Sequence, residues 1–179
     1  FFGGTVNVTN LLAVNPDDDM FDFTQGYSGT LKNCYGVWES GYTSTEADPR
    51  GIEADGNLDG DYSDHLRQSD FTVENMTIVN NAANTTDNVD RMQDVIKIRR
   101  GAKATITNAL VKGSGGTIDL IDMNDSKGVG NAASSISITH TLNFKNKLNG
   151  TLNTFTEPTT NTGADASLFT WSGYNFSSL

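Results

Sequence analysis

Apolar and polar residues alternate over short stretches along the whole chain. The alternation is clearest in three pairs of apolar residues that lie two positions apart: Val6 and Val8, Phe71 and Val73, Ile136 and Ile138. A period of two puts one side of a β-strand against a core and the other side in solvent. No window shows the wider spacing of an amphipathic helix, so the pattern predicts short strands throughout.

One strand-like motif recurs along the chain: an apolar residue, any residue, an Asn and a mostly apolar stretch. It reads "VTNLLAV", "LKNCYGV", "VENMTIV" and "ITNALVK", with a divergent copy "ITHTLNF". The copies align one column of residues: Asn10, Asn33, Asn75, Asn108 and His140. Asn tolerates left-handed backbone, and stacked amides can bond to one another. We therefore interpret this column as turn-forming residues and not as ligands.

A second motif alternates strictly with the first: "DMFDF", "RGIEA", "DVIKI" and "DLIDM". A strand this short cannot form a hydrophobic core by itself, but strands stacked in parallel can form one core together. The sequence predicts an all-β, right-handed, single-stranded parallel β-helix with loop insertions at its corners and one domain over residues 1–179. It has about five rungs, and one column should point inward: Phe21, Ile52, Ile96 and Ile121.

The sequences near both ends of the chain lead to predictions about the two ends of the solenoid. Gly3 to Val14 matches later rungs, which predicts that this domain is the C-terminal part of a longer solenoid. An open edge around Phe1 and Phe2 would favour end-to-end pairing with another copy. The aromatic stretch "ASLFTWSGYNF" predicts a cap near residues 165–179 that closes the last rung, formed by Phe169, Trp171, Tyr174 and Phe176.

Several stretches together resemble a family of secreted or cell-surface repeat proteins of Bacteroidota. They are "FFGGTVNVTNLLAVNPDDDMFDFTQGYSGTLKN", "RGIEADGN" and "FTVENMTIVNN". The resemblance implies a parallel β-helix at an extracellular or outer-membrane surface. It implies no catalytic residues, because none is established for such proteins.

Composition narrows the possible partners. The formal charge of −10 opposes binding to nucleic acid, whose phosphates are also negative. One Cys and two His argue against a zinc or copper site. No apolar run approaches the roughly 18 residues of a membrane helix, so no membrane span is expected in this segment.

Aromatic residues beside a corner insertion are candidates for ligand binding. Tyr35, Trp38 and Tyr42 lie at or next to the insertion "WESGYTSTEADP", and "NNAANTTDNVDRMQ" leaves the repeat at the same point. Exposed rings stack on sugar faces, so these three residues predict a glycan-binding surface. The alternative is that the rings only pack the loop onto the solenoid.

A column of ionisable residues is the candidate catalytic site. Each member is flanked by apolar residues and should point outward: Asp22, Glu53, Lys97 and Asp122. Asp19, Asp94 and Asp119 flank the column, with Arg50 in register. Paired carboxylates can act as acid and base in a polysaccharide lyase or glycoside hydrolase. The same residues also fit a plain ladder of salt bridges between rungs.

The stretch "DGNLDGDYSDHL" is a candidate calcium loop. Asp55, Asn57 and Asp59 match the first half of an EF-hand loop, and Asp61 continues the oxygen donors. Leu66 stands where the bidentate Glu is required, so the sequence predicts at most a looser Ca²⁺ loop. The alternative is a solvated acidic turn without an ion.

These observations favour a secreted or surface-exposed structural and binding module that takes a glycan or another surface ligand without catalysis. The alternative is a carbohydrate-active enzyme that uses the outer acidic column.

Overall fold

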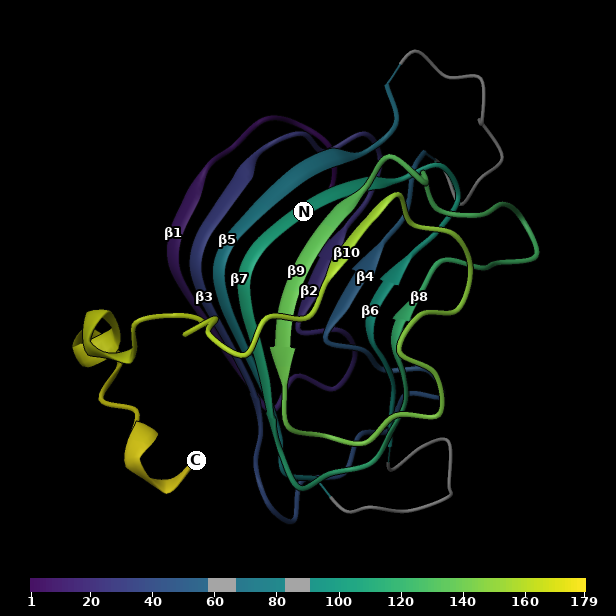
Figure 1. The fold of residues 1–179 in the computed structure, drawn as a ribbon. Coiled ribbons are helices and arrows are strands. Elements are labelled where there is room, and N and C mark those ends of the chain that lie inside the picture. The colour runs from purple at the N-terminus through teal and green to yellow at the C-terminus, as the bar shows by residue number, and fades with distance from the viewer. Residues whose placement is uncertain (58–66, 83–90) are drawn as a thin grey trace.

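The protein is a stack of short parallel strands in two sheets (Figure 1). The computed structural model describes residues 1–57, 67–82 and 91–179. The six-stranded sheet has the order β1 (Val8–Val14), β3 (Thr30–Trp38), β5 (Asp70–Asn80), β7 (Lys103–Gly113), β9 (Ser135–His140) and β10 (Thr154–Thr156). The four-stranded sheet has the order β2 (Phe21–Phe23), β4 (Ile52–Ala54), β6 (Met92–Ile98) and β8 (Thr117–Asp122).

From β1 to β9, successive strands alternate between the two sheets, so each pair of strands forms one rung of a solenoid. Every pairing between the named strands is parallel. Parallel pairing lets each rung cover the apolar residues of the next, which is how strands of three to eleven residues obtain a common core. The predicted parallel β-helix is confirmed.

The core lies between the sheets and contains the predicted inward column. Phe21 pairs with Ile52, Ile52 with Ile96 and Ile96 with Ile121, and all four side chains are buried. Phe23 stacks on Phe71 of the opposite sheet, with ring centroids 3.9 Å apart. The column prediction is therefore confirmed, and the stack extends across the space between the sheets.

The Asn column forms the bend within the long strands β1, β3, β5 and β7. Asn10, Asn33, Asn75 and Asn108 have φ of 56°, 60°, 57° and 52°. Asn33 Nδ2 donates to Asn10 Oδ1 at 2.9 Å, and Asn108 Nδ2 donates to Asn75 Oδ1 at 2.8 Å. Asn accepts this left-handed backbone at lower cost than most residues, so the interpretation as turn formers is confirmed.

His140 does not belong to the Asn column, and its predicted place there is wrong. Ala109 pairs with Ile138, which puts His140 opposite Val111. The register shifts between Ile106 and Ala109 because the β9 copy of the motif is one residue shorter. His140 instead faces Glu157, with Nε2 2.8 Å from Oε1.

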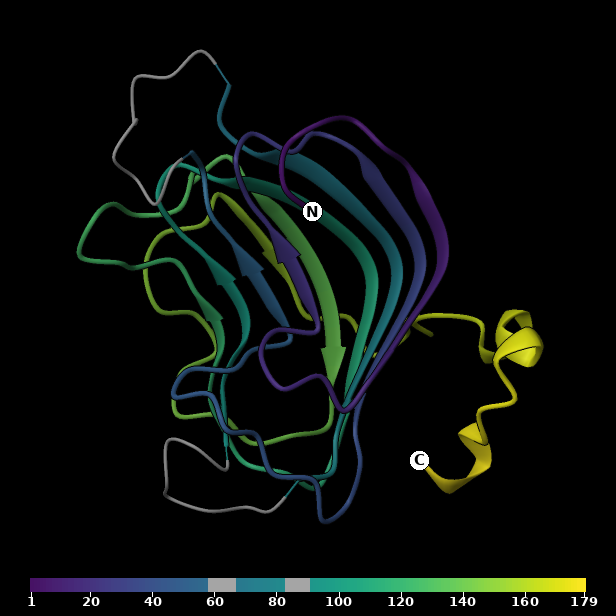
Figure 2. The same ribbon diagram turned by 180° about the vertical axis from the view of Figure 1, so that it is seen from behind.

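The C-terminal strap, residues 161–179, runs across the outer face of the six-stranded sheet (Figures 1 and 2). It contains the 3₁₀ helices η2 (Ala166–Ser172) and η3 (Phe176–Ser178). Polar groups on the bends hold its backbone: Thr162 N donates to Asn108 Oδ1 at 2.8 Å, and Asp165 N donates to Asn33 Oδ1 at 2.6 Å. The strap thus crosses several rungs.

The aromatic residues of the strap pack on the side of the sheet, and their predicted role in closing the last rung is wrong. Phe169 and Phe176 meet the ring of Tyr35 at centroid distances of 6.1 and 4.8 Å. Trp171 is 67% exposed. The apolar patch formed by Tyr35, Val37 and Val79 on the outer face explains this position, because burying it removes apolar surface from water.

At the N-terminal end, β1 is the edge strand of its sheet. Phe2 and Val6 are exposed, as expected for an open edge, but Phe1 stacks on Phe23 at a centroid distance of 5.3 Å. End-to-end self-association stays a prediction. Within the described ranges, no helix has the length and apolar character needed to cross a membrane.

Candidate functional site

The side of the four-stranded sheet that faces away from the core is lined with ionisable side chains. The register pairs Asp22 with Glu53, Glu53 with Lys97 and Lys97 with Asp122, which confirms the predicted column. A second column runs beside it, because Asp94 of β6 pairs with Asp119 of β8. Together with the arginines that reach them, these residues form the charged face: Asp22, Arg50, Glu53, Asp55, Asp94, Lys97, Arg99, Arg100, Asp119, Asp122 and Asp125.

Two buried cations connect neighbouring rungs of the charged face. Arg50 bonds Glu53 through NH1 and Asp94 through Nε, the latter at 3.4 Å. Lys97 bonds Asp122 and lies 4.0 Å from Asp94. The ladder of salt bridges is therefore present. Removing one partner of an ion pair this buried would be strongly destabilising, because it leaves an uncompensated charge away from water.

Arg99 and Arg100 continue this network toward the turn after β4. Arg99 NH2 lies 2.8 Å from Glu53 Oε2, and its Nε donates to Asp55 Oδ1 at 2.8 Å. Arg100 Nε donates to Asp125 Oδ2 at 3.0 Å, and its NH1 lies 3.4 Å from Asp55. Asp55 is thus shared by two guanidinium groups.

The position of Asp55 argues against the predicted calcium loop. Two arginines next to its carboxylate repel a divalent cation and already occupy its oxygens. Asn57 Nδ2 donates to the backbone oxygen of Arg67 at 3.1 Å. The other two predicted ligands, Asp59 and Asp61, lie outside the described residues. The spacing that suggested the loop carried no information about the arginines, which come from the neighbouring rung and lie more than forty residues away along the chain.

Burial raises the pKa of several carboxyl groups on and beside this face. Burial raises the pKa of Glu53 to about 7, although Arg99 and Arg50 oppose the change, and burial raises the pKa of Asp94 to about 6. The pKa of Asp19 rises to about 9 through burial and repulsion from Glu53, and its Oδ1 is buried without a hydrogen bond. Carboxyl groups that titrate near neutral pH are candidates for proton transfer.

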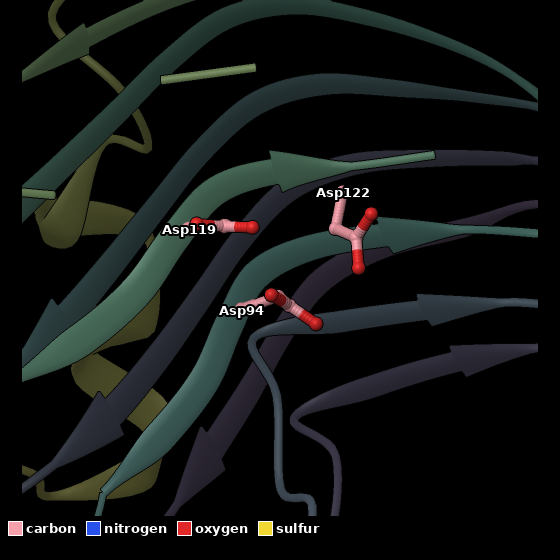
Figure 3. Close-up of side chains that lie close together, drawn as sticks. All are labelled: Asp94, Asp119 and Asp122. Atoms are coloured by element: carbon pink, nitrogen blue, oxygen red, sulfur yellow. The ribbon is translucent and has the colours of Figure 1, made fainter. Parts of the chain in front are cut away.

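Three aspartates converge on the charged face, as Figure 3 shows. Asp94, Asp119 and Asp122 are buried and each offers an oxygen within 4.8 Å of the others. Oxygen ligands of this kind suit Ca²⁺. However, Lys97 pairs with Asp122, and Asn146 Nδ2 donates to Asp119 Oδ1 at 2.7 Å. The ammonium group thus already balances part of the negative charge of the cluster.

The three aromatic residues predicted to bind glycan do not form an exposed platform. Trp38 is completely buried, and its indole N–H donates to Pro16 O at 3.0 Å. Tyr42 is half-buried and also bonds Pro16 O, at 2.9 Å. Tyr35 is 4% exposed beneath the strap. The prediction of exposed stacking rings is wrong for Tyr35 and Trp38. The alternative that the rings pack the insertion onto the solenoid is confirmed for Trp38, which contacts the ring of Tyr42, whereas Tyr35 packs against the strap.

Sequence reasoning missed two parts of the charged face. Arg99 and Arg100 directly follow the motif "DVIKI", and their proximity to that strand was the available signal. Asn146 and Asn149 pair with Asp119 and Asp122 and extend both columns by a further rung. Their spacing of three residues, equal to that of the two aspartates, could have revealed them.

Two sheets of stacked parallel strands, with a ladder of ionisable side chains on the outside of one, define a parallel β-helix protein. Residues 1–174 match the model of the pectate-lyase-like β-helix domain, and the chain belongs to that family. No curated protein and no solved structure gives a significant match to the chain.

Proposed function

We propose that the protein is a secreted or surface-exposed β-helix module that binds carbohydrate at the charged face without cleaving it. The observation that carries this proposal is the charged face itself: a register-locked surface of acids and bases on a pectate-lyase-like β-helix. Carboxylate oxygens accept hydrogen bonds from sugar hydroxyls, and Asp22 of this face is exposed enough to do so. The surface location rests on the resemblance described above.

The ion pairs support binding over catalysis. Arg50, Lys97 and Arg99 each contact at least two carboxylates, so their charges are engaged within the protein. A general base or electrostatic catalyst must instead reach the reacting atoms of the substrate. In this arrangement the cations fix the positions of the acids, and the acids present a preorganised polar surface.

A polysaccharide lyase or glycoside hydrolase is the second candidate, and one observation favours it. The pKa of Glu53 is raised to about 7 and that of Asp94 to about 6. An acid with a pKa near the working pH transfers protons efficiently. In this case Asp22, Glu53, Lys97 and Asp122 would carry the acid and base roles.

Calorimetry on a panel of neutral and acidic polysaccharides, combined with assays for new reducing ends and for unsaturated products, separates the two candidates. We expect binding without products and weaker binding by Asp22→Asn. Glu74→Gln is a matched control, because Glu74 is an acid on the other sheet, paired with Lys32. Turnover that disappears in Glu53→Gln would establish the enzyme instead. Absence of binding to every glycan would overturn the proposed function.

A further inference from the structure

Lys97 and Asp122 meet on adjacent strands of the charged face, largely out of contact with water. The two residues pair in register between β6 and β8, and Lys97 Nζ donates to Asp122 Oδ2. Only 10% and 12% of their side chains are accessible. The lysine–acid pairs at Lys32, Lys103 and Lys147 are much more exposed, since 34% or more of each lysine side chain is accessible. An amine and a carboxyl group are thus held together at a site with little water.

The two carboxylate oxygens of Asp122 have different partners. Oδ2 accepts from Lys97, whereas Oδ1 accepts from the backbone N–H of Asn124 at 2.9 Å. A backbone N–H in this position stabilises negative charge on Oδ1 when a nucleophile attacks the carboxyl carbon, as the donors of an oxyanion hole do. On the other side of Lys97, Glu53 pairs with it in register, but the Glu53 carboxylate already bonds two arginines. Asp122 is therefore the carboxyl group placed to react with the Lys97 amine.

A third carboxyl group lies beside this pair. Asp94 is on β6, three residues before Lys97, and its Oδ2 lies 4.0 Å from Lys97 Nζ. Asp94 and Asp122 each offer an oxygen within 4.8 Å of the other (Figure 3). Arg50 Nε donates to Asp94 Oδ2 at 3.4 Å and helps to fix its position. Burial raises the pKa of Asp94 to about 6, although Lys97 opposes the change. Asp94 can therefore pass a proton between the two reacting groups.

We propose that Lys97 and Asp122 condense to an amide, an intramolecular isopeptide bond between β6 and β8. The ammonium group of Lys97 gives one proton to Asp122 Oδ2, and the neutral Nζ then attacks Cγ. The C–N bond forms, and negative charge moves to Oδ1, next to the Asn124 N–H. Asp94 protonates Oδ2 and takes a proton from Nζ, the C–Oδ2 bond breaks, and one water molecule leaves. An ammonium and a carboxylate thus become an amide and water, without an oxidant or another reactant.

Two physical factors favour this condensation in the folded protein. The register of β6 and β8 holds the two groups in contact, which raises their effective concentration by orders of magnitude over that of free reactants. Formation of the amide also removes two buried charges whose desolvation is costly. The bond closes a loop between positions 97 and 122, which restricts the unfolded chain as a disulfide does and should raise the melting temperature. The inference does not depend on glycan binding.

Mass spectrometry of the intact protein tests the inference. We expect the mass of the wild-type protein to be lower by one water molecule than the mass calculated from its sequence, also under denaturing and reducing conditions. After digestion with trypsin, Lys97 and Asp122 should appear in one branched peptide, with no cleavage after Lys97. A deficit that maps to a single linear peptide, as a cyclised aspartate would give, would overturn the inference.

Lys97→Arg separates the covalent bond from the ion pair, because a guanidinium keeps the positive charge but stays protonated and does not attack the carboxyl carbon. This variant should have the full calculated mass and a lower melting temperature. Lys103→Arg is the matched control, because Lys103 also pairs in register with an aspartate, Asp70, but at an exposed position, so the water deficit should remain.

Asp94→Asn should leave most of the purified protein unlinked, because the proton transfer that releases water is slowed. The full calculated mass in folded wild-type protein, or an equal water deficit in Lys97→Arg, would overturn the inference. Neither result affects the proposed glycan binding, which calorimetry measures separately.

Discussion

The inward column makes a quantitative prediction about stability at Ile96. This residue lies on β6, is completely buried, and pairs with Ile52 on one side and Ile121 on the other. Ile96→Ala removes three carbon atoms from the centre of the stack. At about 0.8 kcal/mol for each buried methylene, the lost burial of apolar surface (the transfer term) lowers the free energy of unfolding by about 2.4 kcal/mol.

The cavity left by Ile96→Ala adds to this transfer term. Ile52 and Ile121 cannot move far into the space, because parallel pairing holds their strands on either side of β6. We therefore expect a total loss of about 3–5 kcal/mol in the free energy of unfolding, the upper part of the range for such truncations.

Urea unfolding followed by circular dichroism and by tryptophan fluorescence measures this loss, since Trp38 is a buried reporter. Ile96→Val should cost about 1 kcal/mol, and Val6→Ala, at a side chain that is 62% exposed, at most about 0.5 kcal/mol. A loss below about 1 kcal/mol for Ile96→Ala would refute the reasoning, because the column would then not be packed. Midpoints that differ between the two probes would show that the rungs do not unfold as one unit.

Two further predictions concern the bend and the charged face. Asn108→Ala should lower the free energy of unfolding by roughly 1–2 kcal/mol, because left-handed backbone is unfavourable for Ala and the hydrogen bonds to Asn75 and the strap are lost. Asn108→Gly should recover part of this loss in urea melts, since Gly adopts left-handed backbone without strain. Burial raises the pKa of Glu53 from 4.5 to about 7, so the folded chain binds a proton that the unfolded chain releases between these values. Stability should therefore fall as pH rises from 4.5 to 7, and Glu53→Gln should flatten this fall in thermal melts across that range; an unchanged profile would contradict the assignment.

The sequence predicted the register of the solenoid because register depends on a local pattern repeated along the chain. Alternation with a period of two determines which side chains of a strand face the core. In a stacked copy of the same pattern, the side chains at the equivalent positions must also face the core. The columns that begin at Phe21 and Asp22 could therefore be aligned by inspection. The Asn bends were equally accessible, since their left-handed conformation is a property of each Asn and its neighbours.

The same reasoning failed where the repeat loses a residue or ends. Aligning the motif copy from Ile138 puts His140 in the wrong column, because Ile136 is the residue that pairs with Ile106 and β9 has one residue fewer at the bend. The aromatic composition of the strap predicts that its rings pack against the solenoid, but it does not predict which surface they cover. Which surface buries it was decided by Tyr35, Val37 and Val79, which form one apolar patch only after the rungs stack.

The sequence by itself thus determined the fold class, the inward column and the outward ladder of acids, because alternation and repetition are encoded locally. The tertiary structure decided the environment of each candidate site. Asp55 became a partner of Arg99 and Arg100, and Trp38 became buried, through contacts across rungs. The raised pKa of Glu53 arises in the same way, since burial and the approach of distant charges are properties of the assembled stack that no single rung contains.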